Sequence, residues 1–231
     1  MIKPKVIAVI PARGGSKGIP KKNIMPICDK PLLAWSILHA KNATQIESVW
    51  VTSDDLEILD VAKEYGAETI QRPSHLAGDA SSSEAAWIHA IQHMKQQKIN
   101  PDLIVGMQAT SPIRGADDLD LAIFQFMAEE LDSLLAATEV DDYFSWRIGS
   151  TNAEPIDHDF KNRKPRQEIR TKYLENGSFY IFKPENIRKN INRLSGKIGI
   201  YAMEKYKMFQ IDNPADAILC EVIMRGYGLD S

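Results

Sequence analysis

Residues 5–23 read KVIAVIPARGGSKGIPKKN. The segment from Lys5 to Ile10 is an apolar run that ends at Pro11, as expected of a strand buried inside a parallel sheet. The loop that follows is rich in glycine and in basic residues. Open α/β sheets bind ligands beyond the carboxyl ends of their strands, so this strand and loop predict an α/β fold with a ligand site at the loop.

The rest of the chain continues an alternation of strands and helices. We predict further strands at 46–52, 68–71, 102–107, 132–137, 177–182 and 198–203. We predict helices at 31–40, 54–65, 84–94 and 117–129, a helix after Pro184, and a C-terminal helix that begins at 212–216. Asp54 is expected to cap the second helix, with Gly66 just past its end. Such alternation forms βαβ units around a mostly parallel sheet.

The alternation is interrupted between about residues 139 and 176. This stretch is polar, and its basic residues fall within twelve positions: Lys161, Arg163, Lys164, Arg166, Arg170 and Lys172. We predict a single domain over residues 1–231 with an insertion at about 139–176. A solvated loop region is the alternative interpretation.

The composition excludes several classes of protein. Of the 231 residues, 44% are hydrophobic and 26% are charged, close to the average of globular domains, which excludes a disordered chain, a fibrous repeat and a coiled coil. The formal net charge is −3, whereas a generic polyanion binder is strongly basic, so no nucleic acid partner is expected. A small anionic substrate needs only a local basic cluster and stays allowed.

The first apolar run, from Val6 to Ile10, is too short to span a membrane, and Pro11 and Arg13 interrupt any signal-peptide pattern. The two cysteines, Cys28 and Cys220, have no zinc-like spacing and are expected to be free thiols rather than a disulfide. We therefore expect a cytoplasmic protein with no membrane partner.

The loop from Pro11 to Asn23 is suited to phosphate groups. Its three glycines let backbone N–H groups approach a ligand, and Arg13, Lys17 and Lys22 can neutralise phosphate charge. It has neither the G-K-[ST] ending of a Walker A loop nor the G-x-G-x-x-G dinucleotide pattern. On composition alone, a flexible surface turn is the alternative.

The string IPARGGSKGIPKKNI at 10–24 resembles the signature of the acylneuraminate cytidylyltransferases, the CMP-sialic acid synthetases. The resemblance continues in order over nearly the whole chain: TSDD at 52–55, RPSHLAGDASSSE at 72–84, QATSPIR at 108–114, PRQ at 165–167, ENGSFYI at 175–181 and FQIDNPAD at 209–216. Several motifs in the same order are far more specific than one. The related Kdo cytidylyltransferases lack the paired glycine and the S-K-G run, so they fit less well.

The resemblance implies a fold, a reaction and an assembly. The fold is a three-layer, mostly parallel, Rossmann-like nucleotidyltransferase sheet with an inserted dimerisation subdomain. In the reaction, the anomeric hydroxyl of a nine-carbon α-keto sugar acid attacks the α-phosphorus of CTP, and the products are a CMP-sugar and pyrophosphate. This chemistry needs charge neutralisation and in-line positioning. The implied assembly is a homodimer.

The resemblance also assigns nucleotide-binding residues. Positions that match the family's triphosphate loop are Ala12, Arg13, Ser16, Lys17, Lys22 and Asn23, and positions that match its cytidine loop are Arg72, Asp79, Ser82 and Ser83. Arg13, Lys22 and Asp212 are the expected catalytic residues, since the two cations stabilise charge that develops on the phosphates and Asp212 matches a metal position in the family. For the serines, helix capping is the alternative, because Ser81–Ser83 precede Glu84 as in a capping box.

Recognition of a sugar acid requires an arginine fork, an amide and an aromatic or apolar wall. The resemblance implies Arg166 for the sugar carboxylate and Gln108, Asn176 and Tyr180 as further sugar-site residues. In the implied dimer, Arg166 reaches into the neighbouring active site. The alternatives are that Arg166 belongs to a solvated basic cluster and that Tyr180 is a core aromatic residue on a strand.

Mg²⁺ is the implied metal, with Asp212 as its ligand. Gln210 stands where some members have a second carboxylate, so one metal ion and two are both open. Asp216 is expected to cap the last helix. Residues 141–147 (DDYFSWR) are acidic and aromatic where sialic acid synthetases have a lysine or a histidine-rich string, so the sugar is either an N-acylneuraminate or a relative such as legionaminate or an unacylated acid.

Two other functions stay open at this point. One is a different sugar nucleotidyltransferase, for example of the CMP-Kdo type, and the other is a non-catalytic nucleotide-sugar-binding protein. Lys17, Lys22 and Asp212 together favour an enzyme over the binding protein.

Overall fold

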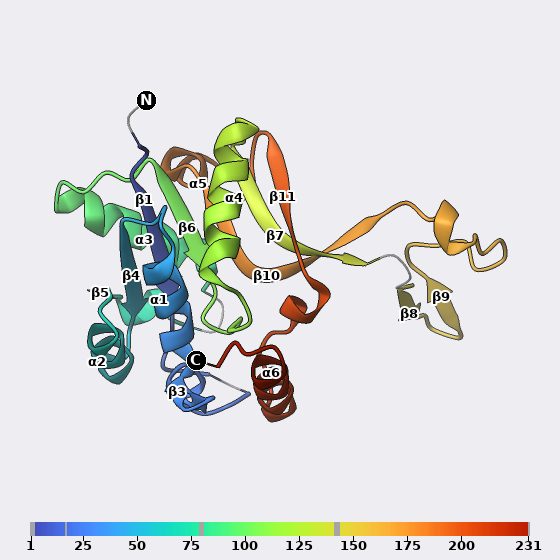
Figure 1. Ribbon diagram of the computed structural model, residues 1–231, viewed down its shortest axis with the longest axis horizontal. Coiled ribbons are helices and arrows are strands. Elements are labelled where there is room, and N and C mark those ends of the chain that lie inside the picture. The colour runs from blue at the N-terminus through green and yellow to red at the C-terminus, as the bar shows by residue number, and fades with distance from the viewer. Residues whose placement is uncertain (1–2, 17, 79–80, 141–143, 231) are drawn as a thin grey trace.

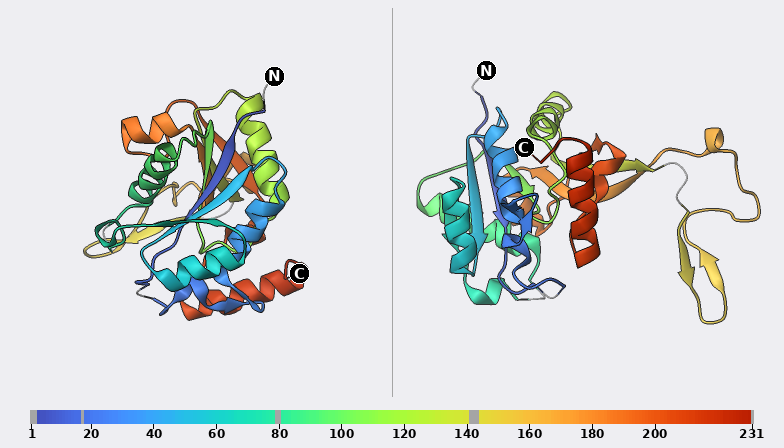
Figure 2. Two further views of the ribbon diagram at one scale, coloured as in Figure 1. Left: turned by 90° about the vertical axis from the view of Figure 1, so that its left-hand side faces the viewer. Right: turned by 60° about the horizontal axis from the view of Figure 1, so that its bottom comes forward.

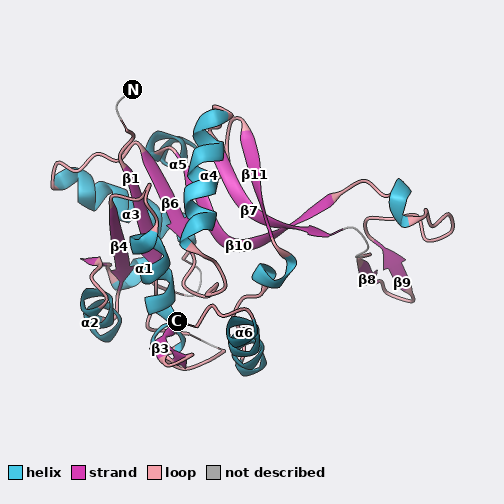
Figure 3. Ribbon diagram, in the orientation of Figure 1, coloured by secondary structure: helices cyan, strands magenta, loops and turns pink. Residues whose placement is uncertain are grey.

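The computed structural model describes residues 3–16, 18–78, 81–140 and 144–230. Its centre is a seven-stranded sheet (Figure 1, Figure 3). In spatial order the strands are β11 (Ile198–Met203), β7 (Ser133–Val140), β10 (Lys172–Phe182), β6 (Leu103–Met107), β1 (Val6–Pro11), β4 (Ser48–Ser53) and β5 (Glu68–Gln71). β1, with strands on both sides, is therefore an interior strand of the sheet.

Most strand pairs are parallel, as predicted. β1 is parallel to β4 and β6, β4 is parallel to β5, and β7 is parallel to β11. β10 is the exception, since it is antiparallel to both β6 and β7. The segment between β7 and β10 lies outside the sheet. The chain then re-enters the sheet as β10, in the direction opposite to β7.

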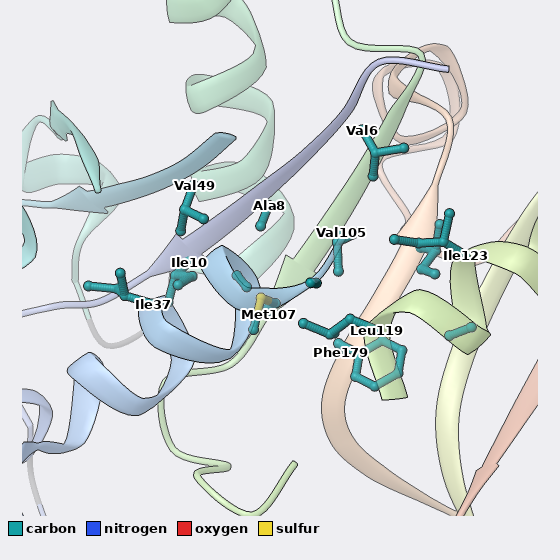
Figure 4. Packing of buried hydrophobic residues seen from close by; sticks show 14 of the residues in the cluster. Val6, Ala8, Ile10, Ile37, Val49, Val105, Met107, Leu119, Ile123 and Phe179 are labelled. Carbon is teal, nitrogen blue, oxygen red and sulfur yellow. The ribbon is translucent and has the colours of Figure 1, made fainter. Parts of the chain in front are cut away.

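Helices cover both faces of the sheet. On one face lie α1 (Leu32–Asn42), α2 (Leu56–Glu64) and α4 (Ala116–Ala128), packed over a core to which β1, β4, β6 and β10 contribute (Figure 4). On the other face lie α3 (Ser83–Gln96) and α5 (Pro184–Asn190). The three-layer α/β architecture expected from the resemblance is confirmed.

Gly106 on β6 explains how α3 packs so closely. A Cβ at this position would lie 2.7 Å from the indole of Trp87, so only glycine leaves room for that side chain. The buried indole donates from Nε1 to the carbonyl oxygen of Val9 at 3.2 Å. This contact fixes α3 against β1 and β6, whose carboxyl ends border the cavity described below.

The second predicted helix has a different cap from the one expected. Asp55 caps α2, and its carboxylate accepts hydrogen bonds from the backbone N–H groups of Glu57 and Ile58. The prediction that Asp54 caps this helix is therefore wrong, because β4 and its hydrogen bonds continue to Ser53, whose hydroxyl accepts from the N–H of Asp55 at 3.1 Å. Asp54 Oδ1 instead accepts from the N–H of Gly14 at 3.3 Å, which ties β4 to the first loop.

An arm projects from the sheet between β7 and β10 (Figure 1, Figure 2). The two strands continue beyond the body as a ribbon in which Lys172 pairs with Val140, so β10 begins earlier than the predicted strand at 177–182. The arm contains β8 (Trp146–Ile148) paired antiparallel with β9 (Ala153–Pro155), and the short 3-10 helix η3 (Arg166–Glu168). Its aromatic rings form a small cluster of their own: Phe144, Trp146, His158 and Phe160.

The chain returns to the first loop at its C-terminal end. The helix α6 (Pro214–Gly226) packs on the hairpin of β2 (Pro26–Ile27) and β3 (Lys30–Pro31), with Cys28 and Cys220 buried as free thiols. The remaining 3-10 helices are η1 (Lys22–Ile24), η2 (Ser74–Leu76) and η4 (Lys205–Met208). Within the described residues, no helix has the length and apolar character needed to cross a membrane.

Candidate active site

A cavity of about 420 Å³ opens at the carboxyl ends of β1 and β6. Its walls come from the first loop, the segment before and at the start of α3, the loop after β6, and the segment before α6. Ten predicted site residues line it: Ala12, Arg13, Ser16, Lys22, Asn23, Arg72, Ser82, Ser83, Gln108 and Asp212. Two others, Lys17 and Asp79, lie outside the described residues.

Internal hydrogen bonds hold the first loop open around the cavity. The buried Asn23 donates from Nδ2 to the carbonyl oxygen of Arg13 at 2.9 Å, so its amide shapes the loop from within. The guanidinium of Arg13 donates to the carbonyl oxygen of Gly78 at 3.2 Å, across the cavity mouth. The first loop and the segment before α3 are therefore joined by a cation.

Gly18 brings this loop against the C-terminal segment. A Cβ at Gly18 would lie 2.3 Å from the carbonyl oxygen of Asp212, a distance that no side chain can occupy. The loop thus needs glycine here for close backbone approach.

Lys22 joins the same two segments by charge. Its Nζ lies 3.0 Å from Asp212 Oδ1 and donates to the carbonyl oxygen of Ile211 at 2.9 Å. The Lys22 side chain is 13% exposed, whereas that of Asp212 is 73% exposed. The cation is thus fixed in the wall and the carboxylate faces outward, where it can meet a ligand or a metal ion.

Arg72 forms the opposite wall and has unused hydrogen-bonding capacity. It is 5% exposed, and one terminal nitrogen donates to the carbonyl oxygen of Ala12 at 3.2 Å. Its Nε is buried with no hydrogen-bond partner among the described residues. Burial lowers the pKa of the guanidinium, and the neighbouring Asp54 opposes that effect. An unpaired buried donor on a cavity wall is costly without a ligand acceptor.

The serines at the start of α3 divide between two roles. Ser82 caps the helix, since its hydroxyl accepts from the N–H of Ala85 at 3.2 Å. The Ser83 hydroxyl instead accepts from the side-chain amide of Gln108 at 3.2 Å. Glu84 does not complete a capping box but pairs with Arg193. Capping therefore accounts for Ser82, while Ser83 and Gln108 form a polar pair in the cavity wall.

The sequence interpretation missed Arg114, the residue that fixes the loop after β6. It is 1% exposed and donates to the carbonyl oxygens of Ser178 at 2.6 Å and Gln108 at 2.7 Å, and to the hydroxyls of Ser178 and Ser36. Burial lowers its pKa to about 9, opposed by Asp118. It ends the QATSPIR string, and its place in a motif that carries the resemblance was the available signal.

Two predicted sugar-site residues do not line the cavity. Asn176 is buried, accepts from the N–H of Ser178 at 3.1 Å and stabilises the irregularity of β10 beside Gly177, whose φ is +65°. Tyr180 is 3% exposed, packs edge-on against Trp87 and donates its hydroxyl to Glu175. Each is engaged in contacts within the fold, and the side chain of Arg166 lies outside the described atoms.

The carboxylates near α6 have different roles. The N-cap of α6 is Asn213 rather than the predicted Asp216, which lies in the first turn of the helix and completes the capping box by accepting from the N–H of Asn213 at 2.9 Å. Asp216 also accepts from the N–H of Asp212 at 2.9 Å. The amide of Gln210 is turned away and donates to the carbonyl oxygen of Asn176 at 2.6 Å. The described residues contain no group of three or more His, Cys, Asp or Glu side chains that could hold a metal ion. Among the described residues, Asp212 supplies the one carboxylate that lines the cavity.

Comparisons with known proteins agree with this geometry. The family model described as Cytidylyltransferase matches residues 7–224. An N-acylneuraminate cytidylyltransferase of Oncorhynchus mykiss is 34% identical over 97% of this chain, which spans about half (52%) of that relative's length. A pseudaminic acid cytidylyltransferase of Campylobacter jejuni is 37% identical over 77% of this chain and 78% of its own.

A solved structure shares the fold at low identity. The CMP:2-keto-3-deoxy-manno-octonic acid synthetase complexed with CTP superposes with a TM-score of 0.73 at 15% identity, over 96% of this chain and 99% of that one. At this identity the likeness shows the fold alone.

Proposed function

This chain belongs to the cytidylyltransferase family, and on that premise we propose that it transfers the cytidylyl group of CTP to a nine-carbon α-keto sugar acid. The relatives named for N-acylneuraminate and pseudaminic acid support this substrate class. The observation that carries the proposal is the convergence of the glycine-rich basic loop, Arg72 and the Lys22–Asp212 pair on one cavity at the carboxyl edge of the sheet.

The cavity offers matching groups for each part of CTP. The backbone of the loop around Ser16 and Gly18, with the cations of Arg13 and Lys22, suits the triphosphate. Arg72 lines the other wall, where its guanidinium can donate to the nucleoside or to a phosphate oxygen. Lys17 and Asp79 are further proposed nucleotide ligands from the sequence.

In the proposed reaction the anomeric hydroxyl of the sugar acid attacks the α-phosphorus. A bond forms between that oxygen and phosphorus, and the hydroxyl proton is released to solvent. The bond from the α-phosphorus to the bridging oxygen of the β-phosphate breaks, and pyrophosphate leaves with the electron pair. Lys22 and Arg13 stabilise the charge that develops on the phosphate oxygens. No covalent intermediate with the protein is needed.

The residues present fit a magnesium ion carried largely by the nucleotide. Mg²⁺ takes one or two carboxylates together with phosphate oxygens and waters, and the exposed Asp212 provides one carboxylate at the cavity. The amide of Gln210 is engaged with Asn176, so it adds no charge to the site. When bound, the ion would neutralise phosphate charge, while Lys22 keeps the Asp212 carboxylate oriented toward the cavity.

We further propose a homodimer in which the arm carries Arg166 to the neighbouring site, where it binds the sugar carboxylate. The exposed apolar side chains on the arm, among them Trp146, Ile148 and Ile156, support a contact with a second copy. Sedimentation should show a dimer. Mixing Arg166→Ala subunits with Lys22→Ala subunits should restore activity, because one site in the mixed dimer then has both residues.

We also propose that the protein is cytoplasmic, since the cytoplasm keeps thiols such as Cys28 and Cys220 reduced.

Pyrophosphate release tests the proposal directly. The protein is incubated with CTP, ATP, GTP or UTP, each against N-acetylneuraminate, legionaminate, pseudaminate, 2-keto-3-deoxy-manno-octonate and an unacylated nine-carbon acid. Turnover with CTP and a nine-carbon acid is expected. Preference for another nucleotide or for the eight-carbon acid would select a different sugar nucleotidyltransferase, and binding without release would select a non-catalytic protein.

A further inference from the structure

Arg193, in the loop between α5 and β11, is held in place by residues from α3 and β10. Its Nε lies 2.7 Å from Glu84 Oε1, and the two side chains are 25% and 12% exposed. The guanidinium lies over the ring of Tyr180 at 4.4 Å and over that of Trp87 at 5.2 Å. An ion pair on one edge and aromatic rings on one face fix the orientation of this group.

The pair leaves part of the guanidinium unused. Arginine has five N–H donors, and the bond to Glu84 uses the one on Nε. Within the described part of the chain, the terminal nitrogens of Arg193 have no hydrogen-bond acceptor. If the Arg193–Glu84 pair served only to attach this loop to α3, the rigid and partly exposed terminal N–H groups of Arg193 would have no role. The arrangement is instead preorganised to bind an acceptor from outside.

The partners of Arg193 adjoin residues that line the cavity on its β6 side. Glu84 follows Ser83, which lines the cavity, and Tyr180 pairs with Gly106, two residues before Gln108. Along the sheet, Arg72 follows β5, the basic loop follows β1 and Gln108 follows β6. A nucleotide bound between Arg72 and the basic loop leaves the space beyond β6, toward β10 and Arg193, for the second substrate.

The surroundings of Arg193 indicate the group that it binds. Its charge is already balanced by Glu84, which favours a neutral acceptor over a carboxylate. On the same sheet face Tyr180 pairs with Leu135, and Leu135 pairs with Ile200, which is 39% exposed. An acylamido group matches these surroundings. It has a neutral oxygen acceptor for the N–H groups of Arg193 and a small alkyl group for the aliphatic side chains.

We propose that Arg193, positioned by Glu84, donates to the acylamido oxygen of the sugar acid while the alkyl part of the acyl group packs toward Leu135 and Ile200. Arg193 is thus a specificity-determining residue for the acylated substrate. This inference rests on the proposed function. Glu84 acts through Arg193 and is a positioning residue.

The test compares acylated acids with a hydroxyl analogue in one assay. Pyrophosphate release from CTP is measured with N-acetylneuraminate, legionaminate and pseudaminate, and with 2-keto-3-deoxynononate, which carries a hydroxyl in place of an acylamido group. For the acylated acid used best, we expect Arg193→Gln to lower kcat/KM relative to the hydroxyl analogue by about tenfold, because a charged donor is lost. The KM for CTP is expected to change by less than about twofold, since Arg193 does not touch the nucleotide.

Two further variants separate binding from folding. Arg193→Lys keeps a cation beside Glu84 but removes the fork, so it should show the same loss of discrimination with an unchanged melting temperature. Arg188→Gln, an exposed arginine on α5, should leave the ratio unchanged. An unaltered ratio in Arg193→Gln, or an equal fall with both sugars, would overturn this assignment alone. No turnover by the wild type with any of these acids would overturn the proposed function and this inference together.

Discussion

Lys22 and Asp212 stand 190 residues apart in the chain and 3.0 Å apart in space, Nζ to Oδ1. The ion pair joins the first loop of the sheet to the segment before the last helix, across the mouth of the candidate active site. Both residues line the cavity, so the contact belongs to the site as well as to the fold.

Replacing Lys22 should reduce catalysis far more than folding. Lys22→Ala removes the one cation buried in this wall among the described residues, and we expect kcat to fall by about 100-fold because phosphate charge loses its stabilisation. Lys21 is a matched control, since it is exposed and pairs with Glu57 outside the cavity. Steady-state pyrophosphate release measures both, and similar losses in the two variants would contradict the role of Lys22.

Asp212 should set the magnesium dependence. For Asp212→Asn we expect kcat to fall by about 100-fold and the half-saturating Mg²⁺ concentration to rise, because the carboxylate at the cavity is lost. A Mg²⁺ titration of initial rates checks this. Asp60→Asn, at an exposed surface pair with Lys63, serves as the control. An unchanged titration curve for Asp212→Asn would remove it from the metal site.

Two glycines of the first loop, Gly18 and Gly15, should respond very differently to substitution. In Gly18→Ala the new Cβ would collide with the carbonyl oxygen of Asp212, so we expect the KM for CTP to rise by about tenfold as the loop moves. In Gly15→Ala the Cβ meets nothing within 4 Å, and the KM should change little. Equal effects of the two substitutions would show that close packing at Gly18 is unimportant.

Arg114 should contribute mainly to stability. Arg114→Met leaves the carbonyl oxygens of Gln108 and Ser178 without their buried donor, and we expect the free energy of unfolding to fall by about 3 kcal/mol. Urea unfolding followed by circular dichroism measures this. The exposed Arg147 on the arm is the control. A loss below about 1 kcal/mol would mean that water replaces these bonds.

The two thiols should resist modification in the folded protein. Burial raises the pKa of Cys220 to about 12, so almost none of this thiol is ionised at pH 8, and burial also raises the pKa of Cys28. We expect iodoacetamide to label neither residue in the native state and both in denaturant, as read by mass spectrometry. Rapid labelling of the native protein would show that α6 separates from the β2–β3 hairpin.

Much of the fold could be predicted because local signals agree with it. The apolar run ending at Pro11, the glycine-rich loop and the alternation of helices and strands identify a parallel α/β sheet with its site at the carboxyl edge. Which residue caps a helix is harder to predict from the sequence. Asp54 and Asp55 have equal capping ability, and only the hydrogen bonds that extend β4 to Ser53 decide between them.

The rest depends on contacts between distant segments. Tyr180 has the same sequence signal whether it faces a ligand or a core, and its burial follows from the position of Trp87 on another helix. Arg114 is an ordinary loop arginine until Ser36 and Ser178 surround it. The orientation of Gln210 is likewise set by the irregularity of β10 at Gly177, which no local pattern around residue 210 reveals.

The contact between the first loop and the C-terminal segment has a consequence for synthesis on the ribosome. Residues 6–203 supply both faces of the sheet core, so a nascent chain of that length already has its central packing. The cavity lacks a wall until Asp212 and the residues of α6 that anchor it have emerged. The wall of the candidate site at Asp212 is therefore translated after the residues that form the core of the sheet.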